Sequence, residues 1–156
     1  MTRNDLVREL ASVAGNIRKP MDIILINNAS LVANYVDTNL PDVEFVCNDA
    51  AVGLSSSVRF LDLPIAFEEL HPVYWLSFGK NLNVYSVRYA ELLCIFLATF
   101  DKRYEPYIKW LVHAFRYDDD LECIYETLFD LNLSSLVSKE AKFFIEMCYG
   151  TKPVLL

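Results

Sequence analysis

The 156-residue chain has few of the residues that mark several common classes of protein. It has two histidines and four cysteines, with no Cys-x-x-Cys pair, so a structural zinc site has little support. It has four glycines and no P-loop, nucleophile elbow or dinucleotide-binding fingerprint. Its strongest apolar run, residues 92–100, is too short to span a membrane. These absences exclude a membrane protein and leave the common hydrolase and dehydrogenase classes without positive support.

The composition predicts a single globular domain over residues 1–156. Hydrophobic types make up 54% of the chain and charged types 22%, which is enough apolar material for a dense core. The N-terminal segment carries Arg3, Asp5, Arg8 and Glu9, unlike a signal peptide, and the cysteines are widely spaced. Free thiols of this kind suit a reducing compartment, so a cytoplasmic location is expected. The net charge of -7 argues against a duplex-DNA binder.

The hydrophobic pattern predicts an α+β fold with a small mixed sheet and a helical C-terminal half. Thr2 and Asp5 form the pattern of a helix-capping box, followed by apolar residues at helical spacing. Residues 23–26, 43–47, 58–63, 73–78 and 82–85 have the pattern of strands, and residues 29–36 that of a short helix. From residue 86 onward the pattern is helical, with helices expected over residues 86–100, 105–115, 118–131 and 138–149. Residues 1–85 therefore form the predicted α/β core, and residues 86–150 the helices packed on it.

Three carboxylates at the predicted second and third strands form a candidate metal site. Asp42 and Glu44 are separated by one residue, so both lie on the same face of a strand. Asp62 is placed near the end of the third strand and approaches them if the two strands pair. Carboxylate oxygens are the ligands that Mg²⁺ and Mn²⁺ prefer, and such a site can activate a nucleophile. The alternative is that the acids belong to an ordinary solvated strand face and strand end.

The order of elements around these acids resembles that of a known family. Residues 23–46, with the sequence IILINNASLVANYVDTNLPDVEFV, are similar to the opening of the nucleotidyltransferase superfamily, especially its minimal and abortive-infection-toxin-like branch. That opening is a strand, a Gly-Gly or Gly-Ser turn, a short helix, and a strand with Asp-x-Asp. The turn positions are taken here by Asn27, Asn28, Ala29 and Ser30, and the Asp-x-Asp positions by Asp42 and Glu44. Residues 84–115 resemble a second hallmark, in which two helices flank a basic turn, here with Lys102 and Arg103.

The resemblance implies transfer of a nucleotide from an NTP to a hydroxyl group of RNA, protein or a small molecule. It implies catalytic and metal-binding roles for Asp42, Glu44 and Asp62, with Mg²⁺ or Mn²⁺ as cofactor. Nucleotide binding is implied for five residues, Asn27, Asn28, Ser30, Lys102 and Arg103. The family's glycines let backbone N–H groups approach the phosphates, whereas asparagine side chains occupy that space. A second hypothesis is therefore a degenerate member that binds a protein partner and has no catalytic activity.

Two further features indicate partners. Aromatic residues are concentrated in the middle of the chain, where they either bury the sheet, stack on a nucleobase or form the contact of a homodimer. Six of the 21 acidic residues lie within residues 118–130, which contain no Lys or Arg: Asp118, Asp119, Asp120, Glu122, Glu126 and Asp130. This segment is either a solvated helix face or a docking surface for a basic protein partner.

Overall fold

The structure is a computed structural model that describes residues 1–48, 54–115 and 120–150. The chain divides into two compact units. The first consists of Met1–Leu63 and His71–Arg88, and the second of Pro64–Leu70 and Tyr89–Leu156. The α+β class expected from the sequence is confirmed. The segment Pro64–Leu70 belongs to the second unit rather than to the predicted core, and the assignment of the whole chain to one domain stays a prediction.

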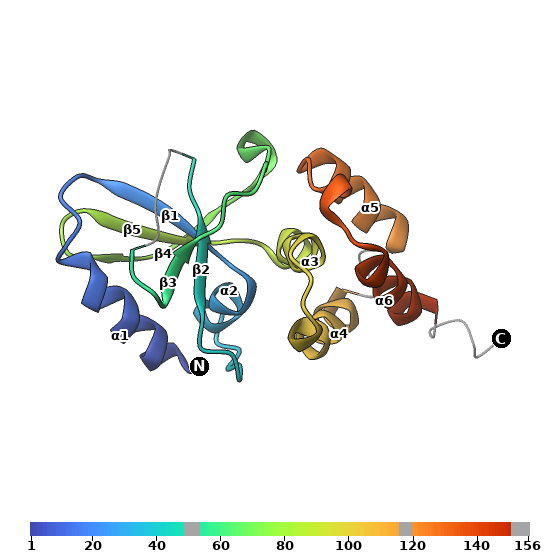
Figure 1. Cartoon of the computed structure of the whole chain (residues 1–156), viewed down its shortest axis with the longest axis horizontal. Helices are drawn as coiled ribbons and strands as arrows, with labels where there is room; N and C mark the ends of the chain where they lie inside the picture. Colours follow the sequence, from blue (N-terminus) through green and yellow to red (C-terminus); the bar gives the residue numbers. More distant parts are fainter. Residues whose placement is uncertain (49–53, 116–119, 151–156) are drawn as a thin grey trace. The chain divides into compact units, whose positions relative to one another are not determined.

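The first unit is a five-stranded mixed sheet with two helices (Figure 1). The strands are β1 (Met21–Ile26), β2 (Val43–Val46), β3 (Val58–Phe60), β4 (Val73–Phe78) and β5 (Leu82–Ser86), in the order β3-β2-β1-β5-β4. The β1–β5 and β2–β3 pairs are parallel, whereas β1–β2 and β4–β5 are antiparallel. All five predicted strands are therefore present, although β3 ends at Phe60 and not at residue 63.

Helices α1 (Arg3–Ala14) and α2 (Asn27–Ala33) pack on one face of this sheet. The predicted capping box is present, since Thr2 Oγ1 accepts from the Asp5 amide and the Asp5 carboxylate accepts from the Thr2 amide. These hydrogen bonds hold the pKa of Asp5 below its usual value. Leu6 and Leu10 of α1 are fully buried against Ile23 and Leu25 of β1. Residues of β1 and β2 at the alternate positions, including Glu44, therefore lie on the other face.

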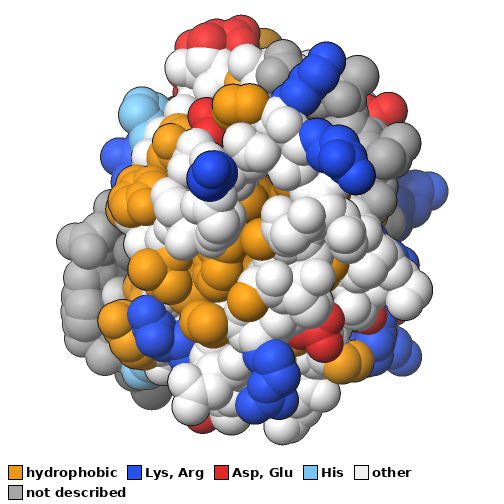
Figure 2. Space-filling model, turned by 90° about the vertical axis from the view of Figure 1, so that its left-hand side faces the viewer, with side chains coloured by type: hydrophobic (Ala, Val, Ile, Leu, Met, Phe, Trp, Pro, Cys, Tyr) orange, Lys and Arg blue, Asp and Glu red, His pale blue; other side chains and the backbone are white. Residues whose placement is uncertain are grey.

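Partly buried hydrophobic side chains also border the core of the first unit, among them Ile17, Met21, Trp75 and Leu76. Figure 2 shows hydrophobic side chains gathered on one face of the molecule with Lys and Arg side chains around them. The Arg3 guanidinium lies over the rings of Tyr35 and Trp75, at 5.3 and 5.6 Å from their centroids. Arg3 therefore covers part of the apolar surface of Tyr35 and Trp75 through cation–π contacts.

The second unit is helical and is organised around α3 (Tyr89–Ala98). Every residue of α3 from Glu91 to Leu97 is buried, as the long apolar run predicts, and α3 contacts α4 (Glu105–Phe115), α5 (Leu121–Asp130) and α6 (Lys139–Gly150). The described residues of the unit also form short 3₁₀ turns, namely η1 (Phe67–Glu69), η2 (Lys102–Tyr104) and η3 (Ser134–Leu136). Helix α5 begins after Asp120, whose carboxylate accepts from the Cys123 amide, while Asp118 and Asp119 lie outside the described residues. Among the described helices, none is both long and apolar enough to cross a membrane.

The central position of α3 generates a stability prediction. Phe96 is fully buried and its ring lies 5.0 Å from that of Tyr104, so Phe96→Ala leaves a cavity in the second unit. We expect the free energy of unfolding to fall by about 3–5 kcal/mol, measured by chemical denaturation. Phe143→Ala, at a position that is 66% exposed on α6, is the matched control. A larger loss in the control than in Phe96→Ala would contradict the assignment of α3 as the core helix.

Candidate functional site

The predicted nucleotide turn lies at the junction of β1 and α2, where the chain passes directly from strand to helix. Asn27 has a φ of 55°, in the left-handed region that Gly and Asn adopt most readily. The side chains of Asn27, Asn28 and Ser30 are all buried. Asn27 therefore gives the junction a left-handed backbone conformation without a glycine.

Each of these three side chains contacts another segment of the first unit. The Asn27 amide Nδ2 donates to Glu44 Oε1 over 2.9 Å, and Asn28 Nδ2 donates to the Leu40 carbonyl over 3.0 Å. Ser30 Oγ accepts from the Val87 amide over 3.3 Å. The turn residues thus connect β1 and α2 to β2, to the loop before β2 and to the residues after β5.

Glu44 is the centre of the polar contacts on the sheet face opposite α1 and α2. Its side chain is 7% exposed, and Oε2 accepts from Arg59 Nη2 over 3.1 Å. The parallel register of β2 and β3 places Glu44 directly opposite Arg59. The same Nη2 lies 3.7 Å from Asp42 Oδ2, so one guanidinium compensates both carboxylates.

Arg59 is the residue that the sequence analysis missed. The metal site was predicted on the condition that the second and third strands pair. They do pair, but the residue that meets Asp42 and Glu44 across the pair is a cation and not the predicted acid. The sequence does carry a signal, because Val58-Arg59-Phe60 alternates apolar and charged residues and Arg59 is the charged one. We interpret the Asn27–Glu44–Arg59–Asp42 cluster as an internal network, and call it the Glu44 network.

Asp62 lies outside this network as the structure describes it. Strand β3 ends at Phe60, and Asp62 follows it as an exposed residue. Within the described ranges 1–48, 54–115 and 120–150, no three or more His, Cys, Asp or Glu residues are grouped so that they could hold a metal ion. A divalent cation between Asp42 and Glu44 would meet the Arg59 guanidinium, so the pair fits Mg²⁺ or Mn²⁺ only if Arg59 moves away. The metal site stays a prediction.

Lys102 and Arg103, the two predicted basic residues, lie in η2 of the second unit. The Arg103 guanidinium donates to both oxygens of Asp101, with a shortest separation of 3.1 Å, and the Arg103 amide also donates to Asp101. These hydrogen bonds hold the pKa of Asp101 below its usual value. Arg103 is therefore engaged locally at the start of η2, and a nucleotide contact by either residue stays a prediction.

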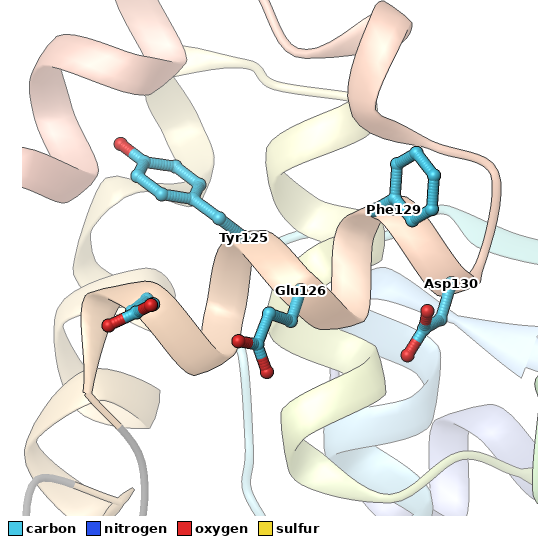
Figure 3. Close-up of a pocket in the computed structure, with 5 residues that line it drawn as sticks. Tyr125, Glu126, Phe129 and Asp130 are labelled. Atoms are coloured by element: carbon cyan, nitrogen blue, oxygen red, sulfur yellow. The ribbon is translucent and has the colours of Figure 1, made fainter.

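A second candidate surface lies on α5, in the predicted acidic segment. A pocket of about 390 Å³ is lined by Glu122, Tyr125, Glu126, Phe129 and Asp130. Figure 3 shows the rings of Tyr125 and Phe129 on one side of the helix and the carboxylates of Glu126 and Asp130 on the other. Phe129 is 75% exposed. We call these five residues the α5 face.

The Tyr125 hydroxyl donates to Glu146 Oε1 of α6 over 2.8 Å. Burial, together with this hydrogen bond and the Glu146 charge, raises the pKa of Tyr125 to about 12. The ring of Tyr125 is thus held in place along one wall of the pocket.

Comparisons of the chain with protein-family models, with curated proteins and with solved structures each found no match. The geometry of the Glu44 network and of the α5 face is therefore the basis for a functional proposal.

The Glu44 network generates a test by substitution. Arg59→Met removes the guanidinium from a buried carboxylate, and we expect the free energy of unfolding to fall by about 2 kcal/mol. Adding Glu44→Gln removes the stranded charge, so the double variant should lose less than the two single losses together. Arg8→Met, which removes an exposed partner of Asp5, is the control and should change stability little. An equal, small effect of Arg59→Met and Arg8→Met in denaturant titrations would show that the network is unimportant.

The hydroxyl of Tyr125 generates a prediction of pH dependence. Its folded pKa of about 12 lies above the unfolded value, so its stabilising contribution is complete below about pH 10 and is lost as the pH rises through 12. Glu146→Gln removes the neighbouring charge and should lower the pKa of Tyr125 without restoring the ordinary value, because burial remains. Titration of ¹³C-labelled tyrosine by NMR, with Tyr125→Phe for assignment, measures both values. Identical titration curves in wild type and Glu146→Gln would contradict the contact.

Proposed function

We propose that this chain is a protein-binding module built on a nucleotidyltransferase-like core, and that the core does not transfer nucleotides. The observation that supports this most directly is the Glu44 network. Both oxygens of Glu44 accept hydrogen bonds from the chain, one from the Asn27 amide and one from the Arg59 guanidinium.

A metal-dependent transferase needs carboxylates whose oxygens are available to the metal. Glu44 is buried, and Arg59 provides the positive charge that a metal would otherwise provide to Glu44 and Asp42. Moving Arg59 away would leave a buried carboxylate without that compensation, which costs stability. The Glu44 network therefore favours a structural role for these carboxylates over metal binding.

The turn at Asn27 supports the same proposal. Phosphate binding at a strand–helix turn requires backbone N–H groups that a ligand can approach closely. The side chains of Asn27, Asn28 and Ser30 are buried and contact Glu44, Leu40 and Val87 within the first unit. Side chains used in this way hold the fold together instead of presenting a phosphate site.

The second candidate function is the nucleotide transfer that the resemblance implies, from an NTP to a hydroxyl acceptor. The φ of 55° at Asn27 favours it, because the junction keeps the left-handed backbone geometry of a glycine turn. This function would use Asp42, Glu44 and Asp62 with Mg²⁺ or Mn²⁺ after a displacement of Arg59.

Isothermal titration calorimetry with Mg-ATP and Mg-GTP separates the two candidates. We expect no binding of either nucleotide to the wild-type chain, and the same result with Mn²⁺. The transferase would instead bind a nucleotide in the wild type, lose it in Asp42→Ala, and keep it in Asp37→Ala, an exposed acid that serves as the control. That pattern would overturn the proposal that the core is inactive.

A further inference from the structure

Helix α5 carries two parallel stripes of side chains. Tyr125 and Phe129 are four residues apart and form an aromatic stripe, while Glu122, Glu126 and Asp130 are spaced by four and form an acidic stripe beside it. The inner side of the helix is occupied by Ile124 and Leu128, which are buried. The two outer stripes together line the pocket (Figure 3).

The aromatic stripe is not explained by the core of the second unit. Phe129 exposes 75% of its surface, although a phenylalanine ring gains free energy mainly by burial. Tyr125 is held by the hydrogen bond from its hydroxyl to Glu146, so the wall beside Phe129 is already ordered. An ordered aromatic wall lowers the entropy that a partner must overcome when it binds.

The acidic stripe favours a positively charged partner at the surface around Phe129. Residues 117–138 contain no Lys or Arg, so the segment that holds α5 has carboxylates alone as its charged groups. Nucleic acids and anionic lipid headgroups are repelled by such a surface, and basic side chains are attracted to it. Three carboxylates spaced by four residues repeat about every 6 Å along the helix axis, which is the repeat that Lys or Arg at i, i+4 and i+8 of another helix would present.

We propose that the α5 face binds a basic amphipathic helix of a partner protein. Apolar side chains of that helix cover Phe129 and Tyr125, and its Lys or Arg residues lie along Glu122, Glu126 and Asp130. The inference rests on the proposed protein-binding function and names the surface and the chemical class of the partner. The two helices would then pack side by side, with the acidic stripe setting the register of the partner helix.

A synthetic helical peptide tests the proposal on the full chain. The probe is a helical peptide of about 18 residues made of Ala, Leu and Lys. Its Leu residues form one stripe along the helix, and Lys residues at i, i+4 and i+8 form a second stripe beside it. Fluorescence anisotropy of the labelled peptide should show saturable binding that weakens as NaCl is raised from about 0.05 to about 0.5 M. We expect Phe129→Ala to weaken binding by about tenfold, and the double variant Glu126→Lys with Asp130→Lys by at least about tenfold.

Matched controls show whether the α5 face itself is the site. The double variant Asp37→Lys with Glu140→Lys makes the same change in net charge at exposed acids elsewhere, and Tyr74→Ala removes an exposed aromatic ring from the first unit. Both should bind the peptide as the wild type does. Peptides with Glu in place of Lys, or with Ala in place of Leu, should bind at least about tenfold more weakly.

Four outcomes would overturn the proposal, the last being absence of peptide binding. One is equal binding of the peptide by the wild type and by the α5 variants. Another is preference for the acidic peptide. The third is self-association of the wild type that Phe129→Ala abolishes, seen by analytical ultracentrifugation, because a second copy of this chain would then cover the face. Nucleotide binding is measured separately, so absence of both nucleotide and peptide binding would reject the α5 face while leaving the inactive core in place.

Discussion

The buried carboxylate of Glu44 is the constraint on which the polar part of the first unit depends. An ionised carboxylate that is only 7% exposed is strongly unfavourable unless other groups compensate its charge. The chain compensates Glu44 with hydrogen bonds from two other residues. The Asn27 amide reaches it from the end of β1, and the Arg59 guanidinium reaches it from β3. Since Asn27 is the first residue of α2, directly after β1, and Arg59 lies on β3, these contacts tie β2 to the segments on both sides of it.

The same network explains why the turn between β1 and α2 can be built from polar residues. A left-handed backbone at Asn27 orients its side chain so that the amide donates to Glu44. Asn28 then donates to the Leu40 carbonyl, and Ser30 accepts from the Val87 amide. Each of these three polar side chains therefore has a structural contact in the first unit. One short segment, Asn27 to Ser30, therefore makes hydrogen bonds to three other parts of the first unit.

The helices and strands could be predicted from local sequence patterns. The candidate metal site could not, because it depends on how the strands pair. The capping box of Thr2 and Asp5 and the buried run in α3 are encoded within a few residues, and both were predicted. The pairing of β2 with β3 was only a condition of the predicted site, and the partner of Glu44 depends on register, which a single strand pattern does not contain. Asp62 was placed on β3 because its neighbours are apolar, yet pairing stops at Phe60. Phe129 has helical spacing that suits a core position, so its 75% exposure became evident only from the packing of α5.

Carboxylates have opposite physical roles in the two units, and this changes the meaning of the net charge of -7. In the first unit Glu44 and Asp42 share the Arg59 guanidinium, which offsets one of their two negative charges. In the second unit the acids of α5 lie on its outer stripe, beside an exposed aromatic ring, in a segment without Lys or Arg. Charge that is compensated inside the fold stabilises it, whereas charge concentrated beside exposed apolar surface can select a partner. The acidity of this chain is therefore better understood as a local feature of α5 than as a property of the whole surface.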